Sequence, residues 1–174
     1  IELEGTYPLP EAQLDRFMFE IVIEHLSEEE EMEVVRSTTG ILKPEFSHTV
    51  TGPDLLAFQE LVRRVPVSES VLRYAVNLVR ASRPSANGDS PDFVKKWIAY
   101  GASVRAAQYL VLGSKAKALT QGRYHVSFDD IKSLAHPVLR HRILTNFHAE
   151  SEGRTTGEII DRLLEHVPVP ASGM

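Results

Sequence analysis

Helical signals fill this chain from Ser27 onward, whereas only one earlier segment has the pattern of a β-strand. Residues 17–24, Phe-Met-Phe-Glu-Ile-Val-Ile-Glu, are mostly apolar and carry β-branched and aromatic side chains on both faces, which is typical of a buried strand. One strand cannot form a sheet, so we expect its partner strands to lie in sequence outside this chain. The pattern therefore predicts a mainly α fold, a helical bundle preceded by an orphan β-strand.

Capping residues mark where several of these helices begin. Ser27, Ser127 and Thr155 are each followed three residues later by Glu or Asp, which is the spacing of a capping box. Apolar residues at helical spacing predict further helices after Ser68 and over residues 104–121. The latter is apolar nearly all round, so we expect it to be the central helix of the bundle. The remaining sequence predicts a helix from Thr51 or Asp54 to Pro66, a short helix over 137–143, and loops over 38–50, 84–92 and 145–154.

The composition of the 174 residues excludes several classes of protein. Hydrophobic residues make up 43% and charged residues 25%, as in globular rather than disordered chains. No cysteine is present, which excludes a disulfide scaffold and fits a reducing compartment. The net charge of −5 argues against broad nucleic-acid binding, and no apolar run approaches the ~20 residues of a membrane span. Because Ile1 does not open a signal peptide, we expect a cytoplasmic protein of which this is a piece.

Two groups of polar residues resemble metal ligands, but their spacing is wrong for that role. His136, His141 and His148 are separated by five and seven residues, whereas ligands on one helix face are three or four apart. Glu28–Glu31 are consecutive, so on a helix their carboxylates point in different directions. We therefore predict no metal site.

Arg105 lies in a position that suits an anion. With Ser103 as the N-cap of the helix over 104–121, Arg105 falls in its first turn, beside the free backbone N–H groups. A helix N-terminus with a cation beside it is a sound phosphate site. A solvated surface arginine is the alternative that this pattern leaves open, and Arg16 by itself indicates nothing.

Several segments together resemble the MoxR family of AAA+ ATPases. Residues 4–17, Glu-Gly-Thr-Tyr-Pro-Leu-Pro-Glu-Ala-Gln-Leu-Asp-Arg-Phe, are similar to a signature of that family. Residues 100–106, Tyr-Gly-Ala-Ser-Val-Arg-Ala, resemble its Gly-Ala-Ser-Pro-Arg-Ala sensor-2 segment, with Val104 where the family usually has proline. Residues 108–123 and 138–142 match in the same order, so the resemblance covers nearly the whole chain.

The resemblance implies a division of the chain and a missing catalytic half. Residues 1–25 would end the α/β nucleotide-binding core, 26–168 would form the helical lid domain, and 169–174 would be a frayed tail. The Gly-x-x-x-x-Gly-Lys-Ser/Thr loop of Walker A is absent from these 174 residues, and no Walker B acids are recognisable. The full-length parent is then expected to use ATP and Mg²⁺, whereas this chain alone should bind neither and should not hydrolyse ATP.

The same resemblance assigns roles to individual residues. Arg16 would be the arginine finger, which reaches the γ-phosphate bound by a neighbouring subunit and stabilises the transition state. Arg105 would be the sensor-2 arginine, which contacts the phosphates bound by its own subunit. The segment that approaches the nucleotide would comprise Gly101, Ala102, Ser103 and Arg105.

The family resemblance also implies partners. The parent would form a ring, expected to be a hexamer, and would remodel or mature a client protein in the manner of a chaperone. The alternative is a helical protein-interaction or DNA-binding module without a nucleotide. Arg140, His141 and Arg142 could belong to a basic recognition helix, but Asp129 and Asp130 make the first half of that region acidic. A stand-alone enzyme would need a nucleophile–base or metal set that the sequence lacks.

Overall fold

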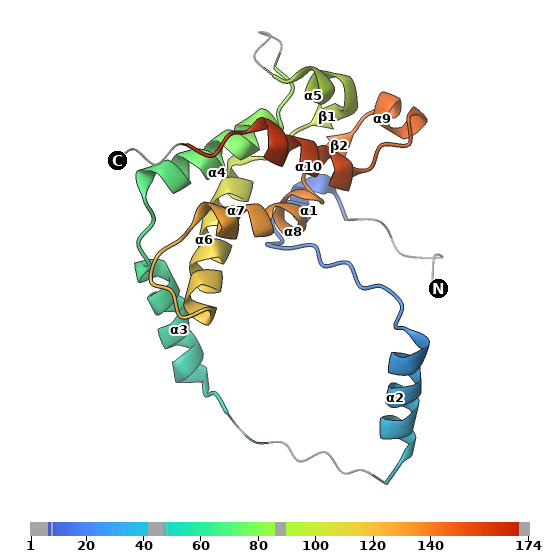
Figure 1. Cartoon of the computed structure of the whole chain (residues 1–174), viewed down its shortest axis with the longest axis vertical. Helices are drawn as coiled ribbons and strands as arrows, with labels where there is room; N and C mark the ends of the chain where they lie inside the picture. Colours follow the sequence, from blue (N-terminus) through green and yellow to red (C-terminus); the bar gives the residue numbers. More distant parts are fainter. Residues whose placement is uncertain (1–6, 8, 42–46, 48, 86–89, 171–174) are drawn as a thin grey trace. The chain divides into compact units, whose positions relative to one another are not determined.

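The computed structural model describes residues 7, 9–41, 47, 49–85 and 90–170, and these residues form ten helices and two short strands. The chain divides into two compact units, one of residues 1–20 with 61–174 and the other of residues 21–60. In chain order the elements are α1 Glu11–Leu14, α2 Glu28–Thr39, α3 Gly52–Arg64, α4 Glu69–Ala81, α5 Asp92–Trp97, β1 Ile98–Tyr100, α6 Val104–Thr120, α7 Phe128–Ser133, α8 Ala135–Leu139, β2 Leu144–Thr145, α9 Phe147–Ser151 and α10 Thr156–His166 (Figure 1).

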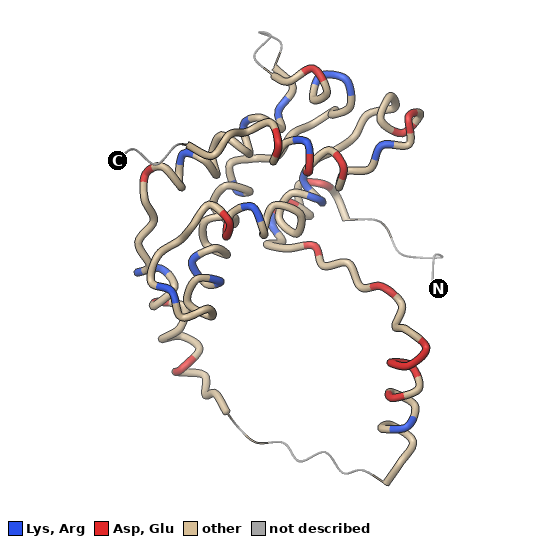
Figure 2. The backbone as a smooth tube through the Cα atoms, viewed as in Figure 1, with Lys and Arg blue, Asp and Glu red and all other residues tan. Residues whose placement is uncertain are grey.

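The unit of residues 21–60 has no core among its described residues. Its helix α2 begins with the predicted capping box, in which Glu30 N donates to Ser27 Oγ at 3.3 Å and Ser27 N donates to Glu30 Oε2 at 2.9 Å. Four consecutive glutamates follow in the first turn, where the helix dipole favours negative charge (Figure 2). No residue of α2 is buried, so this helix is stabilised by its cap and its charges rather than by packing.

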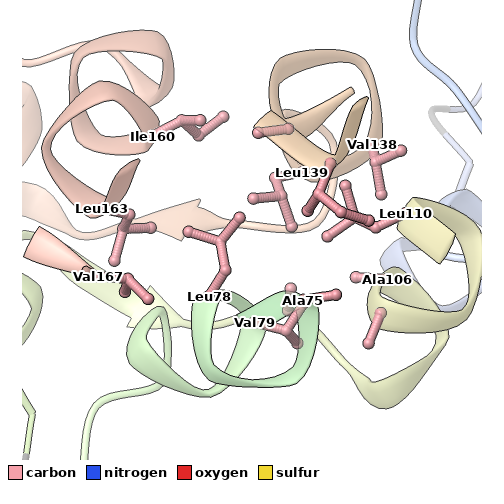
Figure 3. Packing of buried hydrophobic residues seen from close by; sticks show 14 of the residues in the cluster. Ala75, Leu78, Val79, Ala106, Leu110, Val138, Leu139, Ile160, Leu163 and Val167 are labelled. Carbon is pink, nitrogen blue, oxygen red and sulfur yellow. The ribbon is translucent and has the colours of Figure 1, made fainter. Parts of the chain in front are cut away.

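The larger unit is a helical bundle with one continuous hydrophobic core. Leu78 of α4, Leu110 of α6, Leu139 of α8 and Leu163 of α10 are fully buried and point toward one another (Figure 3). Burial of a leucine side chain contributes about 2 kcal/mol, so burying these four side chains stabilises the bundle. The mainly helical class predicted from the sequence is confirmed.

Helix α6 forms as its sequence predicts. It spans Val104–Thr120, and six of its residues are buried, including Ala106 and Leu110. The chain leaves it through Gly122, whose φ of 69° lies in the left-handed region that favours glycine. The capping boxes that begin α7 and α10 are also present, at Ser127 and Thr155.

The prediction for residues 17–24 needs correction. No strand forms there, and Ile21 and Ile23 are 76% and 90% exposed. The apolar pattern indicates a segment suited to burial, but a strand also needs a hydrogen-bonded partner, and the described residues place none beside it.

Two strands, β1 and β2, and two helices, α5 and α9, form where none was expected. β1 and β2 pair antiparallel, with Ile98 opposite Thr145, and strands of three and two residues are too short to show alternation. Within the expected loop over 145–154, Asn146 caps α9 by accepting a hydrogen bond from Ala149 N at 3.1 Å. The short helix predicted over 137–143 lies instead at Ala135–Leu139.

Some predictions fall on residues outside the described part of the chain. These are much of the loop over 38–50, the middle of the loop over 84–92, most of the tail 169–174 and the first residues of segment 1–25. Among the residues that are described, no helix is long and apolar enough to cross a membrane.

Candidate functional site

The backbone that leads into α6 is fixed against the end of α4. A Cβ atom on Gly101 would lie 2.3 Å from Ser82 O, so only glycine fits at this position. Ala102 N donates to Ser82 Oγ at 3.0 Å, and Ala102 O accepts from Arg83 Nε at 2.8 Å. Gly101 and Ala102, the two residues before the N-cap of α6, are therefore held rigidly.

Ser103 and Arg105 occupy the first turn of α6 as predicted. Ser103 is the N-cap, and its Oγ accepts a hydrogen bond from Arg105 N at 3.2 Å. The Arg105 side chain is 39% exposed. A cation, a hydroxyl and backbone N–H groups thus meet at one helix end, where the dipole favours an anion.

The anion that this helix end contacts is the carboxylate of Asp15, which directly follows α1. Arg105 Nη1 lies 2.7 Å from Asp15 Oδ2, and Ser103 Oγ donates to the same carboxylate at 3.0 and 3.1 Å. Arg142 Nε donates to Asp15 Oδ1 at 3.0 Å. We call Asp15, Ser103, Arg105 and Arg142 the Asp15 cluster.

Arg142 is the buried member of the Asp15 cluster. Its side chain is 1% exposed, and its guanidinium lies 5.1 Å from the centre of the Tyr109 ring. Burial lowers the pKa of Arg142, while the hydrogen bond that Arg142 donates to Asp15 and the negative charge of Asp15 oppose that change. Because an arginine starts from a very high pKa, the guanidinium stays charged and needs the carboxylate as its counter-ion.

Arg16 lies next to the cluster but its side chain takes no part in it. The residue is exposed, and its guanidinium makes no ion pair or hydrogen bond with a described residue. Its backbone is held, because Tyr109 Oη donates to Arg16 O at 2.9 Å. The side chain is therefore available to a group outside this chain.

His141 closes one side of the cluster. Its Nε2 lies 3.1 Å from Phe17 O, and its Nδ1 lies 3.8 Å from Glu20 Oε2 without a hydrogen bond. Burial is the main cause that lowers the pKa of His141, so the neutral imidazole is favoured. A small pocket of about 200 Å³ lies against these residues, lined by Glu11, Asp15, Tyr100, Gly101, Ser103, His141, Arg142 and Leu144.

The structure brings Gly101, Ala102, Ser103 and Arg105 together with residues that the sequence does not assign to this site. Asp15, Tyr109 and Arg142 lie within segments that resemble the family, yet nothing in their spacing marks them as partners. Asp15 and Arg142 are 127 residues apart in sequence. The one available signal is that Asp15 directly precedes Arg16.

Of the other candidates considered from the sequence, His136 pairs elsewhere, whereas Arg142 belongs to this cluster and His141 lies against it. The described residues contain no group of three His, Asp or Glu side chains that could hold a metal ion. His136 instead pairs with Asp161, with Nε2 2.8 Å from Oδ1. In the candidate recognition helix, Arg142 is buried and so offers no charge to a DNA surface.

This chain is similar to a known protein family and to proteins of known name. Residues 91–163 match the family model described as the AAA lid domain. The chain is 36% identical over 170 residues to the Chaperone MoxR1 of Mycobacterium tuberculosis, a match that covers 98% of this chain and 45% of that protein. It is 28% identical over 189 residues to the Protein MoxR of Paracoccus denitrificans, covering 99% and 54% of the two chains.

A solved structure supports the fold. The crystal structure of a "putative ATPase" from Cytophaga hutchinsonii superposes with a TM-score of 0.87 at 39% identity, covering 98% of this chain and 52% of that one. The chain thus spans about half the length of the relatives that it matches.

Proposed function

We propose, because this chain belongs to the MoxR family of AAA+ ATPases, that it is the lid-bearing part of a protein that couples ATP hydrolysis to remodelling of partner proteins. The observation that carries the proposal is the start of α6, where Ser103 and Arg105 surround a carboxylate at a helix N-terminus. Phosphate oxygens have the charge and hydrogen-bonding capacity to replace that carboxylate.

In this proposal Arg105 acts on the nucleotide of its own subunit. It exchanges Asp15 for a phosphate oxygen, while Gly101 lets the backbone come close to the end of α4 and fixes the direction of α6. Because α6 packs against α4, α7 and α8, a shift at its first turn would be passed on to these three helices.

Arg16 acts on the nucleotide of a neighbouring subunit. Its exposed guanidinium is the planar, permanently charged group suited to a γ-phosphate in its transition state. The protein would therefore work as a ring, taken as a hexamer, in the cytoplasm. ATP and Mg²⁺ would be its cofactors, and no residue described here is assigned to Mg²⁺.

The proposal makes this chain inactive by itself. ATP hydrolysis needs a loop that cradles the phosphates, and the Walker A pattern is absent from the 174 residues. The purified chain should therefore release no phosphate from Mg²⁺–ATP above background. The assembled ring would recognise the client protein, and the similarity to a relative named as a chaperone supports a chaperone-like role.

Mixed rings of the full-length ATPase test the two arginine roles. Arg16→Ala should lower ATP turnover by roughly 10³-fold and spare nucleotide binding, because the finger acts on the transition state. Arg105→Ala should weaken nucleotide binding as well as turnover. Arg140→Ala, in which a half-buried arginine outside the Asp15 cluster is removed, serves as the control.

The decisive step combines each variant with a subunit whose phosphate loop is disabled. The Arg16→Ala subunit should regain activity, since the partner supplies an intact Arg16 to its site. The Arg105→Ala subunit should not regain activity. Its own site lacks Arg105, the site of its partner lacks a working phosphate loop, and so neither subunit has a complete site. Failure of both mixtures, although mixed rings form, refutes the role of Arg16 in trans.

A further inference from the structure

The short segment of residues 15–18, directly after α1, is held by its carbonyl groups. Asp15 O accepts from Arg142 Nη2 at 2.8 Å, and Arg16 O accepts from Tyr109 Oη at 2.9 Å. Phe17 O accepts from Arg142 and lies 3.1 Å from His141 Nε2, and Met18 O lies 3.4 Å from Arg142 Nη1. Four successive carbonyls therefore contact side chains of the helical bundle, although the segment belongs to no helix or strand.

The donors are themselves rigid. Arg142 is buried, donates to Val138 O of α8, and covers the ring of Tyr109 on α6. A planar guanidinium with its donors engaged in fixed directions holds its acceptors more precisely than a flexible ammonium would. The carbonyls of the segment are thus attached to α6 through Tyr109 and to Arg142, just after α8, while the amides of Arg16 and Phe17 bond to Gln13 O and Leu14 O.

Arg16 belongs to this attached segment, but its side chain is exposed and does not contact the bundle through a hydrogen bond or ion pair with a described residue. Its carbonyl and the carbonyls on either side are all hydrogen-bonded, while its guanidinium is exposed. From this geometry we infer that Tyr109 and Arg142 are positioning residues for Arg16: they hold its backbone on the bundle so that the guanidinium is presented to a neighbouring subunit. This inference rests on the proposed function of Arg16.

The inference is tested in the full-length ATPase with two conservative changes. Tyr109→Phe removes only the hydroxyl that bonds Arg16 O and keeps the ring beneath Arg142. Arg142→Lys keeps the charge beside Asp15 and removes the planar fork. The matched controls are Tyr124→Phe, at a side chain that is 80% exposed, and Arg140→Lys.

The expected result is a loss of turnover without a loss of nucleotide binding. A displacement of about 1 Å at a catalytic group costs up to ~10²-fold, so we expect kcat to fall roughly 10-fold in Tyr109→Phe and up to ~10²-fold in Arg142→Lys. The nucleotide Kd of Tyr109→Phe should stay within about twofold, and Tyr109→Phe subunits should regain activity when mixed with loop-disabled subunits. A general folding defect would not be rescued in this way.

Hydrogen exchange gives a readout that does not depend on activity. The amides of Phe17 and Glu20, which donate to Leu14 O and Pro137 O, should exchange faster in both variants than in their controls. If Arg16→Ala is as active as wild type, the proposed role of Arg16 fails and this inference fails with it. If Arg16→Ala is inactive while Tyr109→Phe and Arg142→Lys keep full turnover and protection, this inference alone is overturned.

Discussion

Two carboxylates in this molecule are each bound by arginine and serine at the start of a helix, and they differ in where their partners come from. Asp130 accepts two hydrogen bonds from Arg123, at 2.6 and 2.8 Å, and one from Ser127 N at 2.8 Å. All of these partners lie within seven residues of Asp130 in sequence. The partners of Asp15 at Arg105 and Arg142 lie 90 and 127 residues away.

The difference separates a local structural contact from one that joins remote segments. The Asp130 side chain is 3% exposed and takes part in the capping box of α7, so it has no access to a ligand. The Asp15 side chain is 24% exposed and lines a pocket. We therefore expect Asp130 to act on stability and Asp15 to act on nucleotide binding.

The largest expected effect is on stability. Asp130→Ala removes the counter-ion of Arg123 and the half of the α7 capping box that the Asp130 side chain supplies, so the free energy of unfolding should fall by about 3 kcal/mol. Urea denaturation followed by circular dichroism measures the change. Asp129→Ala is the control, because the neighbouring carboxylate is 92% exposed. Equal stability of the two variants would contradict the structural role of Asp130.

The pH dependence of stability sharpens the same point. The hydrogen bonds from Arg123, with smaller contributions from Ser127, lower the pKa of Asp130 from 3.8 to about 2, although burial opposes them. Because the folded-state pKa is lowered, the ionised form stabilises the fold above the unfolded-state value, and this contribution is lost as the pH falls from about 4 to about 2. The difference in unfolding free energy between wild type and Asp130→Asn should therefore shrink by about 2 kcal/mol over that range. A difference that stays constant down to pH 2 would show that the charge of Asp130 plays no part.

The comparison also explains which features the sequence could predict. The capping boxes at Ser27, Ser127 and Thr155 were predictable because donor and acceptor lie three residues apart, so local spacing determines the contact. The Asp15 cluster was not, since no spacing rule relates Asp15 to Arg142. Arg105 was found from its place at a helix start together with the resemblance to a family segment.

The segments for which the prediction is wrong also depend on contacts between remote residues. Residues 17–24 have the composition of a strand, but strand formation depends on a partner that local sequence does not supply. The opposite holds for β1 and β2. Their composition does not indicate strands, and they form strands because they pair with each other across 47 residues of sequence. Helical elements longer than ten residues, such as α6, were predicted close to their observed bounds.

The smallest effect that we predict in this comparison arises at Asp15 and acts on binding. Asp15→Asn removes the negative charge that pairs with Arg105 and with the buried Arg142, so the variant should also be less stable than wild type, although its amide oxygen can still accept from Arg142 Nε and Ser103 Oγ. Arg105 then no longer has to break an ion pair with Asp15 before it binds a phosphate. On the proposed function, the full-length protein that carries this change should bind ATP about fivefold more tightly, which corresponds to about 1 kcal/mol.

A fluorescent ATP analogue titrated against wild type and variant measures this change in Kd. Glu11→Gln is the matched control, because it removes a carboxylate from the same pocket that makes no ion pair with a described residue. A general gain from reduced negative charge would appear in both variants, whereas competition for Arg105 predicts it in Asp15→Asn alone. In the double variant Asp15→Asn with Arg105→Ala the gain should disappear, because the side chain over which carboxylate and phosphate compete is absent. Persistence of the gain in that double variant would show that Asp15 acts on the nucleotide by a route other than Arg105.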